Sequence, residues 1–158
     1  GTALAGAELD VWHAGANGLY DQQDPGVPAW HCRGRYRTGA DGRFRIRTVR
    51  PVPYHVPTDG RAGELLRAAG RGALRAAHVH ARVHAAGHRA LTTQWFDLGD
   101  AYLKTDATYS VRDGLVRPWA EVTDEAAAAE LGVPCPFTRL ELEIVLAPGP
   151  HDVGDGRA

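Results

Sequence analysis

The stretch Arg75-Ala76-Ala77-His78-Val79-His80-Ala81-Arg82-Val83 decides how this chain of 158 residues is organised. Its alternating pattern predicts a strand over residues 77–85. Alternate side chains of a strand point to one face, so His78 and His80 share a face that Val79 does not. Two neutral imidazoles on one face can hold a single ion of iron, zinc or copper. The motif alone leaves a second interpretation open, a polar strand face with two solvated histidines.

Short strands and turns are predicted on both sides of this stretch. The 19 glycines and 10 prolines favour many turns over long helices. Helices are expected at residues 61–69, capped by Thr58-Asp59-Gly60, and at residues 123–131. In the first of these, Leu65 and Leu66 would face the core, and Gly70 would end the helix. The other predicted strands are residues 7–12, 33–38, 44–49 (joined to 33–38 by a hairpin at Asp41-Gly42), 90–96, 109–116 and 137–146.

This element pattern predicts the fold class and the domain organisation. Seven or eight short strands with one or two short helices indicate a mainly β fold, a β-sandwich. The length indicates one domain, residues 1–147, followed by a flexible Gly/Pro/Asp-rich tail over residues 148–158.

Composition excludes several function classes. The formal net charge of -1 gives no global field that would attract nucleic acid or a membrane surface. No apolar run approaches the ~20 residues of a membrane-spanning helix. Cys32 and Cys135 lie far apart in sequence, so idle thiols are expected rather than a disulfide, and two cysteines cannot form an all-Cys zinc site.

Two further readings of the histidine motif depend on residues elsewhere. Gly72 followed by His78-x-His80 matches the opening of a cupin metal site, but the Glu that this site needs is missing from residues 81–87. Tyr20 follows a Gly-containing turn, and Tyr54 lies in a proline-stiffened segment. A lone tyrosine is usually a core or interface aromatic. A phenolate, however, is a hard, charged ligand that suits Fe(III).

Several ordered motifs resemble one enzyme family, the intradiol ring-cleavage dioxygenases. The resemblance covers roughly residues 4–147, in the order and spacing of the catalytic domain of that family. The motifs are Leu9-Asp10-Val11-Trp12-His13-Ala14, Gly18-Leu19-Tyr20-Asp21, Arg47-Thr48-Val49-Arg50-Pro51-Val52-Pro53-Tyr54, Val56-Pro57-Thr58-Asp59-Gly60, Arg75-x-Ala77-His78-Val79-His80, Leu91-Thr92-Thr93-Gln94, and Gly99-Asp100-x-Tyr102-Leu103 with Asp106.

The resemblance implies a non-haem Fe(III) centre held by Tyr20, Tyr54, His78 and His80. Tyr54 and His78 would be its axial ligands, and Tyr20 and His80 equatorial. The implied activity is that of a 1,2-dioxygenase. It would use O2 to cleave a catechol-class ring between its two hydroxylated carbons, giving a muconate-type diacid.

The resemblance also implies roles for the residues around this centre. Tyr54 would take up a substrate proton, and the positive charge of Arg75 would lie near the substrate ring. Gln94 would orient groups around the iron. Val56 and Pro57 would line the ring pocket.

Partners and substrate follow as expectations from the same resemblance. The partners would be a small aromatic diol and O2, with no nucleic acid and no membrane. Hydroxyquinol ranks first among the substrates, followed by catechol and chlorocatechol. We expect a cytoplasmic enzyme, because no export signal is seen. The family forms homodimers through an N-terminal helical segment, and both that segment and the first sandwich strand are expected to be absent from this chain.

One departure from the family pattern is Ala76, where the family usually has proline. The alternatives to the enzyme are a non-catalytic β-sandwich binding module and a cupin-like metal enzyme. The binding module would be indicated by loss of a ligand or of Arg75, and all of these residues are present.

Overall fold

The computed structural model describes residues 1–150, which fall into two compact units. The first unit contains residues 1–52, 78–94 and 144–150, and the second contains residues 53–77 and 95–143. Most of the tail predicted at residues 148–158 lies outside the described residues.

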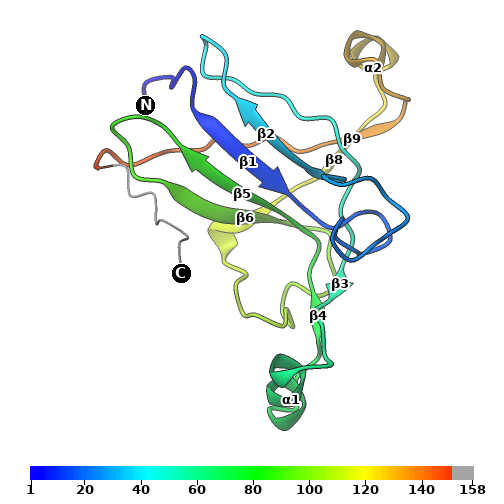
Figure 1. Ribbon diagram of the computed structural model, residues 1–158. Coiled ribbons are helices and arrows are strands. Elements are labelled where there is room, and N and C mark those ends of the chain that lie inside the picture. Colours follow the sequence, from blue (N-terminus) through cyan, green and yellow to red (C-terminus); the bar gives the residue numbers. More distant parts are fainter. Residues whose placement is uncertain (151–158) are drawn as a thin grey trace. The chain divides into compact units, whose positions relative to one another are not determined.

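The first unit is built on antiparallel strands. In it, β1 (Glu8–Trp12) pairs with β2 (Arg33–Arg37) on one side and with β5 (His78–His84) on the other. The strand β6 (Leu91–Asp97) follows β5 in the strand order and continues into the second unit. Figure 1 shows β2, β1, β5 and β6 side by side in that order. The candidate ligands His78 and His80 therefore lie on an inner strand.

The strand register separates an apolar face of β1 and β5 from a polar one. Leu9 lies opposite Val83, and Val11 lies opposite Ala81, and all four side chains are buried. The opposite face carries the residues between them. From β2 through β1 to β5 its three rows are Arg37, Glu8 and His84; Arg35, Asp10 and Arg82; and Arg33, Trp12 and His80.

Charged pairs stabilise the polar face at the end of the strands that lies away from His78 and His80. Arg35 Nε lies 2.8 Å from Asp10 Oδ1, and His84 Nε2 lies 3.0 Å from Glu8 Oε2. Arg37 donates to the same Glu8 carboxylate. Directly opposite pairs of this kind stabilise a single register, and a slip of one residue would turn His78 and His80 into the core.

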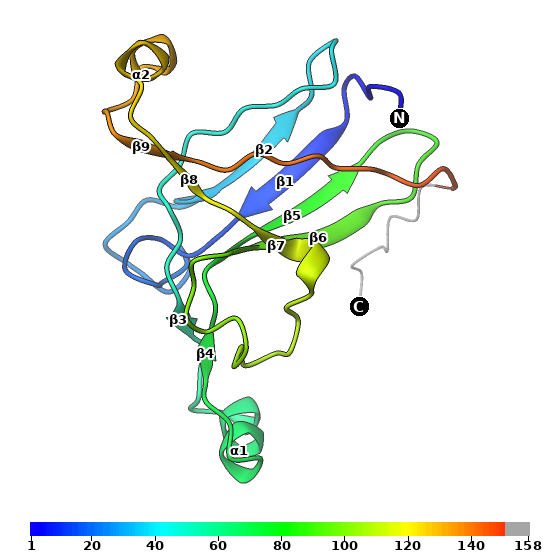
Figure 2. The ribbon, with the colours of Figure 1, turned by 180° about the vertical axis from the view of Figure 1, so that it is seen from behind.

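The second unit holds short ladders joined by loops and two helices. Figure 2 shows β7 beside the end of β6, with which it pairs in parallel. Its core includes Ala76, Ala77, Trp95, Phe96 and Ala107. Its elements are β3 (Tyr54–His55), α1 (Arg61–Ala68), β4 (Leu74–Arg75), the 3₁₀ turn η1 (Asp113–Leu115), β7 (Val116–Arg117), β8 (Ala120–Val122), α2 (Glu125–Leu131) and β9 (Phe137–Arg139).

The mainly β fold with two short helices is confirmed, and most predicted elements are present. The strands predicted at residues 7–12, 33–38, 77–85 and 90–96 are β1, β2, β5 and β6. Gly70 ends α1 as expected, with φ of +63°. Cys32 and Cys135 are free thiols, as predicted. Neither helix of the described part is long and apolar enough to cross a bilayer.

Three predicted strands are wrong in whole or in part. Residues 44–49 belong to no strand, and their burial alternates only as far as Arg47, because Thr48 and Val49 are both exposed. Alternation in sequence also fits an extended segment outside a regular ladder. Residues 109–116 begin with Tyr109 in the left-handed region (φ 53°) and pass through η1, so only Val116 belongs to a strand. Of residues 137–146, only the first three form a strand, β9.

The expected inner face of α1 is wrong for Leu65, which is 71% exposed, while Leu66 is half-buried. The N-cap, Gly60, lies in the predicted capping stretch but makes no side-chain capping bond. The buried residue of this helix is Gly63, where a Cβ atom would lie 2.1 Å from the carbonyl oxygen of Thr58. The helix therefore makes its close contact through a glycine rather than through a leucine stripe.

Candidate metal site

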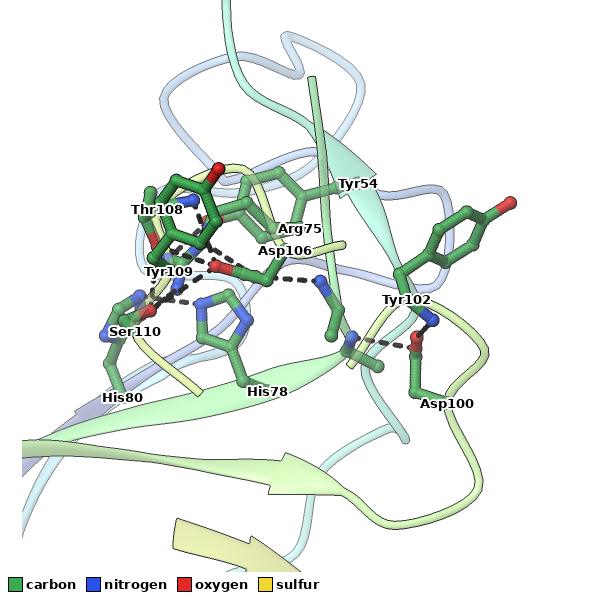
Figure 3. Close-up of polar contacts among 12 residues, drawn as sticks. Tyr54, Arg75, His78, His80, Asp100, Tyr102, Asp106, Thr108, Tyr109 and Ser110 are labelled. Carbon is green, nitrogen blue, oxygen red and sulfur yellow. Dashed lines mark hydrogen bonds and ion pairs between the residues drawn. The ribbon is translucent and has the colours of Figure 1, made fainter. Parts of the chain in front are cut away.

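Two of the three histidines of β5, His78 and His80, point their ring nitrogens at each other. His78 Nε2 and His80 Nε2 are 3.0 Å apart, and the two rings are nearly perpendicular, at 85°. His78 is 1% exposed, while His80 is partly exposed. Figure 3 shows both rings rising from the same side of the strand. The sequence prediction that they share a face is therefore confirmed.

This spacing fits a shared metal ion. An imidazole nitrogen binds a divalent ion such as zinc at about 2.1 Å, so two such nitrogens that subtend a right angle at the ion lie about 3.0 Å apart. A hydrogen bond from one ring N–H to the other ring nitrogen gives the same distance without an ion. Among residues 1–150, no cluster of three or more His, Cys, Asp or Glu side chains could hold a metal. Any ion here therefore needs ligands of another type beside the two histidines.

Trp12 fixes the His80 ring from the neighbouring strand. The register places Trp12 directly opposite His80, and their rings stack at 5.0 Å with an interplanar angle of 11°. The Arg33 guanidinium lies 6.0 Å from the Trp12 ring and 5.2 Å from the Trp30 ring. The stack limits rotation of the His80 imidazole. The sequence analysis did not foresee this contact, although the alternation over residues 8–12 already placed Trp12 on the polar face.

Tyr20 lies in the loop between β1 and β2, beside a small pocket. The Tyr20 amide donates to Gln23 Oε1 at 3.0 Å, and its carbonyl accepts from the amides of Gln23 and Asp24. These bonds hold the backbone at Tyr20 in a turn. The pocket encloses about 150 Å³ and is lined by Trp12, His13, Tyr20, Asp21, Gln22, His31 and Arg33.

His13 lines this pocket and is a structural histidine. It is 2% exposed; its Nδ1 lies 2.7 Å from the carbonyl oxygen of Ala14, and its Nε2 lies 2.8 Å from Thr48 Oγ1. This pattern assigns a neutral ring that donates from Nδ1 and accepts at Nε2. Burial lowers the pKa of His13, and the nearby His31 lowers it further, while the Ala14 carbonyl acts in the opposite direction.

Tyr54 and Arg75 are partners in the second unit. They lie directly opposite each other in the ladder of β3 and β4. Arg75 Nη1 donates to Tyr54 Oη across 3.5 Å, and the guanidinium lies 5.9 Å from the Phe96 ring. Val56 is half-buried and Pro57 is exposed, both just beyond β3. The unit thus brings the predicted proton acceptor and the predicted cationic residue together.

The buried carboxylate of Asp106 contacts Arg75 and the backbone next to it. Its Oδ2 lies 3.4 Å from Arg75 Nε and accepts the Ala76 amide at 3.1 Å. Its Oδ1 accepts the amide and the hydroxyl of Thr108, at 3.0 and 2.7 Å. Burial acts to raise the pKa of Asp106, but the Thr108 hydroxyl, the Arg75 charge and the two amides together outweigh it and lower the pKa.

The predicted site residues divide between the two units. Tyr20, His78, His80 and Gln94 belong to the first unit; Gln94 is half-buried on β6. Tyr54, Val56, Pro57 and Arg75 belong to the second unit. The sequence analysis assigned no role to Asp106 or Ser110. Asp106 was present in a motif, but nothing in the pattern indicated that its carboxylate faces Arg75.

Known proteins share both the sequence pattern and the fold. A family model described as dioxygenase matches residues 1–148. A hydroxyquinol 1,2-dioxygenase from Rhizobium sp. (strain MTP-10005) is 43% identical over 84% of this chain and 45% of its own length. A catechol 1,2-dioxygenase from Acinetobacter baylyi is 37% identical over 92% of this chain and 48% of its own length.

Solved structures agree with these sequence relatives. A hydroxyquinol 1,2-dioxygenase from Pseudomonas putida DLL-E4 matches with a TM-score of 0.84 and 42% identity, over 94% of this chain and 52% of that one. A catechol 1,2-dioxygenase from Acinetobacter sp. ADP1, inhibited by bound mercury, matches with a TM-score of 0.88 and 37% identity, over 94% of this chain and 48% of that one.

Fold and site together define a mainly β protein with paired imidazoles on one strand face. With the family match, this chain belongs to the intradiol ring-cleavage dioxygenase family. The β-sandwich fold class predicted from the sequence is confirmed by the same likeness. The chain spans about half the length of the curated relatives that it matches.

Proposed function

We propose that this protein is an Fe(III)-dependent intradiol dioxygenase. It would cleave the ring of a catechol-class diol with O2, between the two hydroxylated carbons, to a muconate-type diacid. The observation that carries the proposal is the His78–His80 pair, whose facing Nε2 atoms are separated as two neighbouring metal ligands would be. Membership of the dioxygenase family supports iron over the other metals that accept imidazole.

The proposed ligands are Tyr20, Tyr54, His78 and His80. Phenolate oxygen is a hard donor that suits ferric iron, and neutral imidazole is a common partner for it. Ferric iron, when bound, would supply a Lewis acid that favours loss of the hydroxyl protons of the diol, and the resulting dianion has an electron-rich ring that O2 can attack. A free tyrosine has a pKa of about 10, so a bound cation is needed to keep the two phenolates ionised at neutral pH.

The chain's own residues would bind, orient and move protons. Tyr54 Oη is the proposed acceptor of a substrate proton, and Arg75 Nη1 lies 3.5 Å from it. The guanidinium would also stabilise negative charge that develops on the ring, since it is held in a nearly water-free setting. Gln94 is the proposed amide donor beside the ligands, and Val56 and Pro57 the proposed apolar contacts of the ring.

Hydroxyquinol is the substrate that we rank first, ahead of catechol and chlorocatechol. The relatives named as hydroxyquinol and 6-chlorohydroxyquinol 1,2-dioxygenases are 43% and 44% identical, against 37% for the catechol enzyme quoted above. The extra hydroxyl of hydroxyquinol would raise its kcat/KM strongly over that of catechol only if the site hydrogen-bonds that hydroxyl. Measured kcat/KM values for the three diols therefore test this substrate order.

Product analysis tests the reaction class. Iron-loaded protein is incubated with each diol in air, and the ring-opened product is identified by mass spectrometry and NMR. The expected product is a diacid with one carboxyl from each hydroxylated carbon. Cleavage beside the diol, which leaves an aldehyde, would contradict the proposal.

A matched pair of variants tests the site. His78→Ala should abolish turnover, because it removes one proposed ligand. His84→Ala, on the same strand and the same face, should retain it, since His84 pairs with Glu8 instead. Equal activity in the two variants would refute the assignment. The homodimer and the cytoplasmic location expected from the resemblance stay predictions.

A further inference from the structure

Arg75 is an almost fully buried cation held by several groups of the second unit. It is 7% exposed as a whole residue. Its Nη2 donates to Ser110 Oγ at 2.8 Å, its Nη1 donates to Tyr54 Oη, and its Nε lies 3.4 Å from Asp106 Oδ2. Each nitrogen thus faces a different partner, as Figure 3 shows for the cluster. A planar guanidinium held along three directions has little freedom to rotate.

Asp106 is itself fixed more firmly than a surface carboxylate. Its side chain is 1% exposed, and it accepts bonds from Thr108 and from the Ala76 amide. Ala76 stands where the family usually has proline, and proline has no N–H to donate. In this chain the residue next to Arg75 therefore ties its own backbone to the carboxylate that faces the Arg75 side chain.

We propose that Asp106 is the positioning residue of Arg75: its buried carboxylate orients the guanidinium so that Nη1 faces the hydroxyl of Tyr54. Ser110 supports the same orientation by accepting from Nη2. Asp106 would act through Arg75, whose Nε lies 3.4 Å from its Oδ2. The catalytic consequence rests on the proposed function, whereas the orientation of Arg75 does not.

Asp100 provides a matched control in the same loop. Its Oδ2 accepts the Ala77 amide at 2.8 Å and its Oδ1 accepts the Tyr102 amide at 2.7 Å. It therefore anchors backbone one residue further along from Ala76. The Asp100 carboxylate binds these two amides, whereas the Asp106 carboxylate also contacts Arg75. Asp100→Asn and Asp106→Asn both weaken a loop anchor, and Asp106→Asn alone removes the charge facing Arg75.

The first readout is the guanidinium itself, observed by ¹H–¹⁵N NMR in the iron-free protein. The Arg75 Nε–H resonance is assigned by its disappearance in Arg75→Lys. In Asp106→Asn it should shift and exchange with solvent at least about tenfold faster, since a charge-assisted contact is lost. It should stay unchanged in Asp100→Asn and should be restored in Asp106→Glu. An unchanged Arg75 resonance in a folded Asp106→Asn protein would overturn the proposal.

The second readout is the split between kcat and KM in the iron-loaded enzyme. If Arg75 stabilises charge in the transition state, Asp106→Asn should lower kcat about 10- to 100-fold and change KM less than about threefold. Asp100→Asn should change kcat less than about threefold. If Asp106→Asn does not fold, Ser110→Ala gives a milder test, with the same resonance shifted and kcat lowered.

The two readouts separate the two claims. A disturbed Arg75 resonance with unchanged kcat would support the positioning role of Asp106 and refute the role of Arg75 in the reaction. Lowered kcat with an undisturbed resonance would refute the positioning role. Absence of turnover in the wild-type protein would refute the proposed function and leave the resonance as the sole test of positioning.

Discussion

Replacing Thr48 with valine should destabilise the first unit although it removes one oxygen atom and keeps the side-chain shape. Thr48 Oγ1 lies 2.8 Å from Nε2 of His13, a ring that is 2% exposed. Without the hydroxyl, this nitrogen stays buried and loses its hydrogen bond to Thr48. A buried polar atom left unpaired costs about 1–3 kcal/mol. For a chain of this size, that loss corresponds to a decrease in Tm of about 2–10 °C.

Urea denaturation followed by far-UV circular dichroism, at pH 7.5, measures this change. Thr92→Val, at an exposed position of β6, is the matched control and should change the free energy of unfolding by less than about 0.5 kcal/mol. Iron binding should be kept in both variants, because neither residue is a proposed ligand. A Thr48→Val protein as stable as the control would refute the assignment of Nε2 as a buried acceptor.

Three further outcomes are expected. The ring resonances of His13 should titrate below pH 6.5, and titration above that pH would contradict the assignment. Because folding keeps His13 neutral, the free energy of unfolding should fall as the pH drops from 6.5 through the lower folded-state pKa. Gly63→Ala should destabilise the protein despite the helix propensity of alanine, since the new Cβ would meet the Thr58 carbonyl, whereas Ala62→Gly at an exposed position should cost about 1 kcal/mol or less. Thermal melts compare the two variants, and a stabilised Gly63→Ala protein would contradict the close contact. Trp12→Leu should retain iron about tenfold less well against a chelator, because the stack on His80 is lost, while Trp30→Leu should behave as wild type.

The elements that carry the site were predictable because their residues obey a simple period. Alternation over residues 8–12 and 78–84 determined both strands, and it placed His78 and His80 on one face before any register was known. Gly70 could be placed at the end of α1 because the backbone there needs a positive φ. These are local rules, and the local sequence satisfies them.

The errors arose where tertiary contacts decide the outcome. The alternation of residues 44–49 resembles that of β5, but a strand also needs a ladder partner, and this cannot be read from the segment itself. Leu65 fits an amphipathic pattern, yet α1 makes its close approach through Gly63. The contact of Asp106 with Arg75 joins residues 31 positions apart, and the stack of Trp12 on His80 depends on strand register. Neither contact produces a periodic pattern in the sequence from which it could be predicted.

The most direct test of the central claim is the visible spectrum of the concentrated protein with its iron content measured on the same sample. A ferric ion bound by tyrosinate absorbs in the visible through ligand-to-metal charge transfer and gives a red-brown colour. Tyr20→Phe and Tyr54→Phe should each alter this band at equal iron content, while Tyr102→Phe, at an exposed position, should leave it unchanged. A colourless protein with one equivalent of bound ferric iron would contradict the tyrosinate site.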